Sequence, residues 1–272
     1  MKSVLLPFGK VAPAELAADE AKSAARNRLP DQRETKPDTE STRTLTRVVE
    51  VDPLRLESER ILSPGATAQH GVPYKMLRTQ VLRRLDKLGV NTLVVIGTAS
   101  DTGKTLTAIN LAIAIAADPG RTALLVDLDL RRPSIHRRFG FEPVAGIDDC
   151  LRRTSDIKEA LVCPLGYERL VILPARERSV DSSELLSSRR TEDLILEMRN
   201  RYKDRVVVFD LPPVLQADDA LAFARHAQAA LIVVAEGKTR RDDVVRVVEL
   251  LNDVPIIGTV LNGSREPVDA YY

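Results

Sequence analysis

Short runs of apolar residues alternate with stretches of helical spacing between residues 71 and 263. Strands that are covered by helices on both faces have such unbroken apolar runs, because neither side of the strand meets water. The pattern therefore predicts an α/β fold, a doubly wound and mostly parallel sheet with helices on both faces. The predicted strands are 92–96, 123–126, 170–173, 206–209, 231–234 and 256–260, and the predicted helices are 74–88, 104–117, 155–161, 191–202, 218–225 and 241–251.

The N-terminal part of the chain has a different composition. From residue 12 to about residue 63 it is dense in charged residues, Thr and Pro, and it has few large apolar residues. Such a segment buries too little apolar surface to offset its loss of chain entropy. We therefore expect three parts: a largely disordered, flexible arm over 1–65 with at most a short helix near 14–27, a domain over 66–263, and a tail over 264–272.

Charge and cysteine usage exclude several classes of protein. The chain has 40 Lys and Arg against 39 Asp and Glu, so it has no excess basicity with which to hold a nucleic acid. No apolar run approaches the roughly 20 residues of a membrane helix, and no signal peptide is recognisable. Its two cysteines have no partner at metal-ligand spacing. These features predict a cytoplasmic protein that neither spans a membrane nor binds nucleic acid.

The most specific chemical signal is the loop Gly97–Thr105, which joins the first predicted strand of the domain to a nearly all-apolar helix. Its final Gly-Lys-Thr is typical of a P-loop, in which backbone N–H groups and a helix N-terminus face a phosphate. Lys104 would reach the β- and γ-phosphates, and the hydroxyl of Thr105 would bind Mg²⁺. The first glycine stands at position 97, one residue earlier than in the usual pattern. The loop predicts ATP and Mg²⁺ as cofactors.

Three aspartates follow predicted strands. Asp127 and Asp129 come at the end of the second strand, and Asp210 comes at the end of the fourth. Ligands bind at this edge of open parallel sheets, so we expect the three carboxylates to meet the P-loop there. Asp127 and Asp210 are candidate metal ligands together with Thr105. One of Asp127 and Asp129 would contact the metal, and the other would align or deprotonate the acceptor. The sequence does not show which residue has which role.

An ordered series of motifs carries a resemblance. Residues 71–263 resemble the cytoplasmic ATPase domain of bacterial tyrosine autokinases, P-loop NTPases that are associated with exopolysaccharide synthesis and are related to partitioning and cell-division ATPases. The matching segments are Gly-Lys-Thr with 108–112, 126–133, 183–188, 210–215, 219–220 and 258–262. The resemblance implies that Asn262 contacts adenine and that Arg131 pairs with a phosphate or with Asp210. The expected cofactor-binding residues are Gly97, Ser100, Asp101, Thr102, Gly103, Lys104, Thr105, Leu106, Arg131 and Asn262.

The tail ends in Tyr271 and Tyr272, two of only five tyrosines. A polar tail can carry a phenol into the active site of a neighbouring subunit. Together with the resemblance, this predicts a protein-tyrosine autokinase that transfers the γ-phosphoryl group of ATP to these tyrosines, with Lys104, Asp127, Asp129 and Asp210 as catalytic residues. The alternatives are an ATPase switch without kinase activity and a catalytically silent regulatory subunit.

The resemblance also implies partners. It suggests a homo-oligomer that reaches the inner membrane only through a partner, a membrane-bound chain-length-determining protein of polysaccharide synthesis. Two motifs depart from their counterparts in related families. Ala99 stands where partitioning ATPases have a lysine, and Val72, Lys75 and Arg78 stand where the kinase family has Glu, Arg and Arg in its oligomerising helix. Asp101 places a carboxylate close to the nucleotide, so its side chain is expected to point outward.

Overall fold

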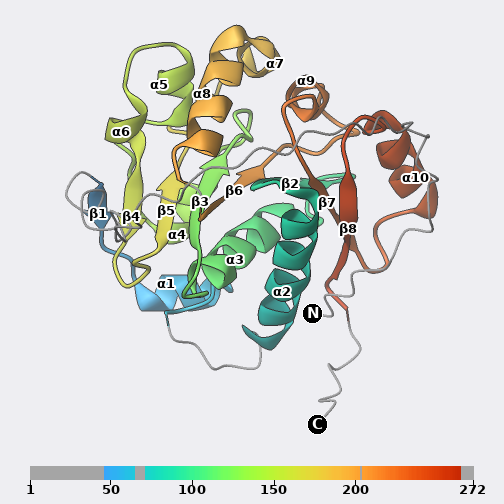
Figure 1. The fold of residues 1–272 in the computed structure, drawn as a ribbon, viewed down its shortest axis with the longest axis horizontal. Helices are drawn as coiled ribbons and strands as arrows, with labels where there is room; N and C mark the ends of the chain where they lie inside the picture. The colour runs from blue at the N-terminus through green and yellow to red at the C-terminus, as the bar shows by residue number, and fades with distance from the viewer. Residues whose placement is uncertain (1–45, 65–70, 203, 265–272) are drawn as a thin grey trace, which may run out of the picture.

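The computed structural model describes residues 46–64, 71–202 and 204–264, and they form one eight-stranded sheet with helices on both faces (Figure 1). All neighbouring strands are parallel except β4 and β5. In sheet order the strands are β1 (Arg47–Val49), β4 (Val162–Pro164), β5 (Leu170–Leu173), β3 (Thr122–Asp127), β6 (Arg205–Asp210), β2 (Thr92–Gly97), β7 (Ala230–Ala235) and β8 (Ile256–Asn262). The predicted fold class and all six predicted strands are confirmed.

Ten helices occur in this part of the chain. They are α1 (Pro53–Ser58), α2 (Gly71–Leu88), α3 (Lys104–Ala116), α4 (Ile135–Phe139), α5 (Ile147–Leu151), α6 (Ile157–Ala160), α7 (Ser182–Ser187), α8 (Arg189–Asn200), α9 (Asp219–Ala224) and α10 (Arg241–Leu250). The six predicted helices appear as α2, α3, α6, α8, α9 and α10. No helix of the described residues combines the length and the apolar character that crossing a membrane requires.

Alternate residues of each central strand pack into two separate hydrophobic cores, one on each face of the sheet. In β2, Leu93 and Val95 join the cluster that contains α2 and α3. Val94 and Ile96, which point the other way, join the cluster that contains α8, α9 and α10. In the view of Figure 1, α2 and α3 lie below the strands and α7 and α8 lie above them. This double burial is the physical reason for the unbroken apolar runs in the sequence.

Residues 46–64 differ from the mobile arm that composition predicts. β1 pairs with β4 at the edge of the sheet, and Val49, Leu56 and Ile61 are buried in the core. Asn110 of α3 also holds this segment, because its side chain accepts from the Leu62 N–H at 2.9 Å and donates to the Arg60 carbonyl at 2.9 Å. Isolated apolar residues with long-range partners give no periodic signal, so the sequence pattern misses them.

The rest of the predicted division cannot be compared with the structure. Residues 1–45, with the short helix proposed near 14–27, and the tail residues 265–272 lie outside the described residues. The domain therefore begins before residue 65, whereas the flexible arm over 1–45 and the separate tail stay predictions.

Candidate nucleotide-binding and phosphotransfer site

The P-loop connects the end of β2 to the first residue of α3, as predicted. Gly103 immediately precedes the helix in a left-handed conformation, with φ of +86°. Gly97 ends the strand, and a Cβ there would lie 2.3 Å from the Thr102 hydroxyl oxygen. The loop folds tightly on itself because both positions lack a side chain. Its turn aims the N-terminal N–H groups of α3 at the carboxyl edge of the sheet.

Asn262, the last residue of β8, lies against this loop. Its Nδ2 donates a hydrogen bond to the Thr102 carbonyl at 2.9 Å. A Cβ on Gly103 would come within 1.7 Å of the same Nδ2, so the asparagine fits only because position 103 is glycine. The structure thus brings Asn262 to the predicted nucleotide site, where its amide holds the shape of the P-loop.

Lys104 turns back toward two of the predicted acids. Its Nζ lies 3.0 Å from Asp129 Oδ2, 3.5 Å from Asp210 Oδ1 and 3.2 Å from the Thr105 hydroxyl. The side chain is buried, and burial alone would lower the pKa of the lysine. The negative charges of Asp210 and Asp129 outweigh burial and raise that pKa above its ordinary value. The lysine is therefore a fixed positive charge at neutral pH.

The acids come from adjacent strands in register. Asp127 of β3 pairs directly with Asp210 of β6, and both side chains are fully buried. Burial, with the nearby charge of Asp210, raises the pKa of Asp127 to about 7. Burial also raises the pKa of Asp210, although the charge of Lys104 opposes the rise. Two carboxylates this close repel each other, so the pair needs a cation or a proton.

The two carboxylates that end β3 have different surroundings. Asp127 Oδ2 accepts from the N–H groups of Ser134 and Ile135, each at 3.0 Å, and Asp127 Oδ1 accepts from the Asp129 N–H at 3.2 Å. The Oδ2 of Asp129 instead faces Lys104. Asp127 therefore shapes the loop that follows β3, whereas Asp129 presents an oxygen to the P-loop.

The donor set suits Mg²⁺ only as part of a nucleotide complex. The described residues contain no group of three or more His, Cys, Asp or Glu side chains arranged to hold a metal ion by themselves. One oxygen of Asp210, Oδ2, is buried and has no hydrogen-bond partner among the described residues. Proteins usually hold Mg²⁺ through one or two carboxylates, with phosphate oxygens and waters completing the coordination. Asp210 with the Thr105 hydroxyl fits that arrangement.

The remaining predicted P-loop residues have distinct surroundings. Asp101 is exposed, as its charge requires, and has φ of +58°. Thr102 is buried and Leu106 is half-buried. Ser100 donates to Gln216 Oε1 from its hydroxyl at 2.8 Å and from its backbone N–H at 3.3 Å. The sequence pattern does not predict Gln216, because it lies in a loop without periodicity or a motif of its own.

Arg131 does not pair with Asp210, one of its two expected partners. It contacts Asp219 and Asp218 at the start of α9, with Nε 2.5 Å from Asp219 Oδ2 and Nη2 3.0 Å from Asp218 Oδ1. No ion pair with Asp210 is recorded among the described residues. Asp210 is instead neutralised by Lys104, which enters from the P-loop beside it. The sequence placed Asp219 in the matching segment 219–220 without a site role, and it gave Asp218 none.

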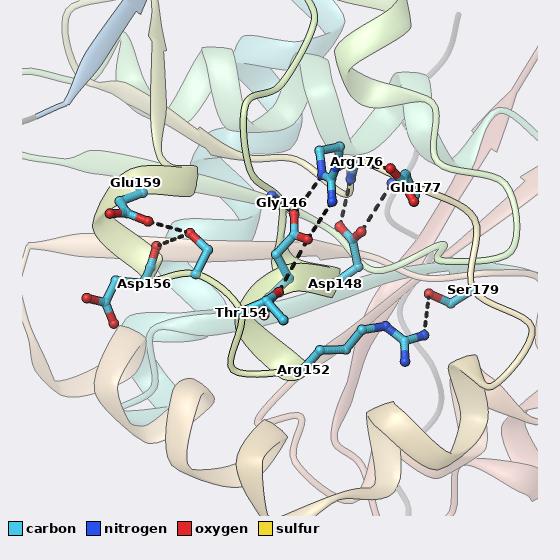
Figure 2. A network of polar contacts seen from close by, with 11 residues as sticks. Gly146, Asp148, Arg152, Thr154, Asp156, Glu159, Arg176, Glu177 and Ser179 are labelled. Carbon is cyan, nitrogen blue, oxygen red and sulfur yellow. Dashed lines mark hydrogen bonds and ion pairs between the residues drawn. The ribbon is translucent and has the colours of Figure 1, made fainter.

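A polar network beside the site orders the loop after β5 (Figure 2). The guanidinium of Arg176 binds both oxygens of Asp149, at 2.7 and 2.8 Å, and the Arg176 N–H donates to Asp148 Oδ1 at 2.7 Å. Further along this loop, the Ser179 N–H donates to the Leu130 carbonyl at 2.9 Å. The loops that follow β5 and β3 are therefore tied together next to Asp129.

The chain resembles known nucleotide-binding domains and tyrosine kinases in sequence. Residues 93–267 match the CobQ/CobB/MinD/ParA nucleotide binding domain. The chain is 28% identical to tyrosine-protein kinase YwqD of Bacillus subtilis over 71% of this chain and 80% of that protein. It is also 28% identical to tyrosine-protein kinase wzc of Salmonella typhi over 80% of this chain, but it spans only 30% of that longer protein.

A solved structure shows the same fold. The crystal structure of the chimerical protein CapA2B2 superposes with a TM-score of 0.69 and 25% sequence identity, and the match covers 85% of this chain and all of that one. The resemblance to bacterial tyrosine kinases that the motifs predict is thus confirmed by sequence and by fold. The chain belongs to the CobQ/CobB/MinD/ParA family of nucleotide-binding domains.

Proposed function

We propose that this protein is an ATP- and Mg²⁺-dependent tyrosine autokinase of exopolysaccharide synthesis. One observation carries the proposal: the Lys104 amino group lies within 3.5 Å of carboxylates from the ends of two different strands, β3 and β6. At this helix N-terminus a triphosphate can bind the lysine, and its metal ion can bind the acids, so that the bound nucleotide replaces the present ion pairs. The kinase names of the sequence relatives support tyrosine as the acceptor.

The transfer requires little covalent chemistry from the protein. Lys104 and the N–H groups at the start of α3 bind the phosphates and stabilise their charge. The bound Mg²⁺, held by Thr105 and Asp210, would supply Lewis-acid stabilisation of the phosphate charge. We assign Asp129 as the group that takes the phenol proton, because its Oδ2 is released when Lys104 turns to the phosphates. The phenol oxygen forms a bond to the γ-phosphorus, and ADP leaves with the electrons of the broken P–O bond.

The acceptor is proposed to be Tyr271 or Tyr272, which lie outside the described residues. Burial argues against two of the other three tyrosines. Tyr74 and Tyr167 are buried in the core, and burial raises the pKa of each phenol to about 12. Tyr202 is half-buried beside the guanidinium of Arg205. Tyr202 is therefore the alternative acceptor that an experiment must control.

We further propose that the chain assembles as a homo-oligomer and acts beside the membrane, bound to a chain-length-determining membrane protein. The span of the match to wzc supports this proposal, since the match covers only 30% of the length of that longer relative. The partner would regulate polymer length through the phosphorylation state of the tail. Co-purification of the two proteins from membranes, and its loss after phosphorylation, would test the link.

Labelled ATP tests the catalytic proposal. The full chain is incubated with γ-labelled ATP and Mg²⁺ beside three variants, Lys104→Met, Tyr271→Phe/Tyr272→Phe and Tyr202→Phe. The kinase proposal predicts label on the wild type and on Tyr202→Phe, and none on the other two. The label on the wild type should map to the tail peptide.

Each other outcome selects a different function. ATP turnover without label on the protein would show an ATPase switch. Absence of nucleotide binding would show a silent regulatory subunit. Label that persists in the tail variant but disappears in Tyr202→Phe would move the acceptor to the surface beside α8.

A further inference from the structure

Arg131 connects the two loops that carry the acids around Lys104. It lies two residues after Asp129 in the loop that follows β3. Its guanidinium reaches across to α9, the helix that follows the loop after β6, where it contacts Asp219 and Asp218. The contact therefore links the segment that bears Asp129 to the segment that begins at Asp210.

The two ion pairs differ in their surroundings. The Asp219 side chain is fully buried, and its Oδ1 has no hydrogen-bond partner among the described residues. The Asp218 side chain is 69% exposed. An exposed ion pair contributes little, whereas a buried carboxylate that loses its cation is strongly destabilised. Asp219 is therefore the partner that fixes Arg131.

The same segment also touches the P-loop, so the contacts close a ring. Gln216, three residues before Asp219, accepts hydrogen bonds from Ser100 of the P-loop. On the other side of the ring, Asp129 binds Lys104, the residue that begins α3. In this ring, the ion pair between Arg131 and Asp219 is the side-chain contact that joins the loop after β3 to the loop after β6. At the strand ends, the Leu128 N–H also donates to the Asp210 carbonyl at 2.9 Å.

We propose that Arg131 is a positioning residue: its ion pair with Asp219 fixes the loop that bears Asp129, so that Asp129 lies beside Lys104 in the nucleotide-free protein and stays in place to take the phenol proton once Lys104 has turned to the phosphates. This inference rests on the proposed kinase function for its effect on rate. Arg131 does not bind nucleotide phosphate in this account, because doing so would strip the buried Asp219 of its cation. Two of its guanidinium nitrogens, Nε and Nη2, are already engaged by α9.

Steady-state kinetics of tyrosine phosphorylation test the proposal. The variants are Arg131→Met, Arg131→Lys and Asp219→Asn, with Arg132→Met as the matched control, since Arg132 is exposed and lies next in the chain. We expect kcat to fall about tenfold or more in Arg131→Met and in Asp219→Asn, with KM for ATP within about twofold of the wild type. Arg131→Lys should recover part of kcat, and Arg132→Met should match the wild type.

A second measurement does not depend on kinase activity. The nucleotide-free proteins are treated with an amine-acylating reagent, and the rate at Lys104 is followed by mass spectrometry with exposed Lys75 as internal standard. Loss of the ion pair between Arg131 and Asp219 should let Asp129 move away from Lys104. Acylation of Lys104 should then be about threefold faster or more in Arg131→Met and Asp219→Asn, and Arg131→Lys should show an intermediate rate. If the wild type transfers no phosphoryl group, the proposed function fails, but the acylation rates still show whether the ion pair between Arg131 and Asp219 positions Asp129.

Two results would overturn the inference. One is a raised KM for ATP with unchanged kcat in Arg131→Met, together with wild-type behaviour of Asp219→Asn, which would make Arg131 a nucleotide ligand. The other is acylation of Lys104 at the wild-type rate in both variants. Thermal unfolding shows whether each variant is folded. If Arg131→Met or Asp219→Asn is unfolded, the folded Arg131→Lys protein is compared with the wild type instead.

Discussion

Substitution of Gly103 by alanine should damage the P-loop for two separable reasons. The residue has φ of +86°, a conformation that costs a residue with a Cβ about 1–2 kcal/mol. The new Cβ would also lie 1.7 Å from Asn262 Nδ2, so the asparagine must leave its hydrogen bond to Thr102. That bond contributes about 1 kcal/mol. The sum is about 2–3 kcal/mol of unfolding free energy.

The matched control is Gly237→Ala. Gly237 has φ of +70°, but nothing lies within 4 Å of a Cβ there, so this variant carries only the backbone cost. At about 2–4 °C per kcal/mol, the thermal unfolding temperature of the nucleotide-free protein should fall by about 4–12 °C for Gly103→Ala and by about 2–8 °C for Gly237→Ala. Binding of ADP, followed by calorimetry, should weaken about tenfold or more only in Gly103→Ala.

A double variant separates the steric term from the backbone term. Asn262→Ala removes the group that the new methyl would strike, so Gly103→Ala/Asn262→Ala should be no less stable than Gly103→Ala alone. Additive losses would show that the two residues do not interact. Equal effects of Gly103→Ala and Gly237→Ala on stability and on ADP binding would refute the packing of Asn262 on the P-loop.

The remaining predictions concern stability. Because burial raises the pKa of Asp127 to about 7, the folded protein holds the proton of this carboxyl more tightly than the unfolded chain does. The unfolding free energy of the nucleotide-free protein should therefore fall as pH rises from about 4 to about 7, by up to about 1.4 kcal/mol per pH unit. Chemical denaturation of Asp127→Asn should show a weaker dependence of the unfolding free energy on pH. A wild-type slope identical to that of the variant would contradict this. In the presence of Mg²⁺, ADP at about 100 times its Kd should raise the unfolding free energy by about 2.7 kcal/mol, and EDTA should remove part of this stabilisation. In Asp210→Asn, differential scanning calorimetry should show a stabilisation by ADP that EDTA does not change. Asn110→Ala should lower the unfolding free energy by about 1–3 kcal/mol and expose residues 60–62 to hydrogen exchange, since it loses both hydrogen bonds to that segment; unchanged exchange would separate the segment from the core.

The sequence predicts the sheet better than it predicts the contacts between loops. Residues 93–96 and 206–209 are apolar because both faces of their strands are buried, so their pattern alone identifies the strands. β1 has a single buried residue, Val49, and no periodicity can identify so short an edge strand. The approach of Lys104 to Asp129 and Asp210 follows from strand ends that share one edge. The pairing of Arg131 with Asp219 depends on how two loops bend, which no local pattern encodes.

The most direct test of the account is a crystal structure of the protein with a non-hydrolysable ATP analogue and Mg²⁺. We predict that the Lys104 amino group leaves Asp129 and Asp210 and contacts the phosphates, while Arg131 stays bound to Asp219. The analogue bound elsewhere, or bound at the P-loop with Lys104 still paired to both acids, would contradict it.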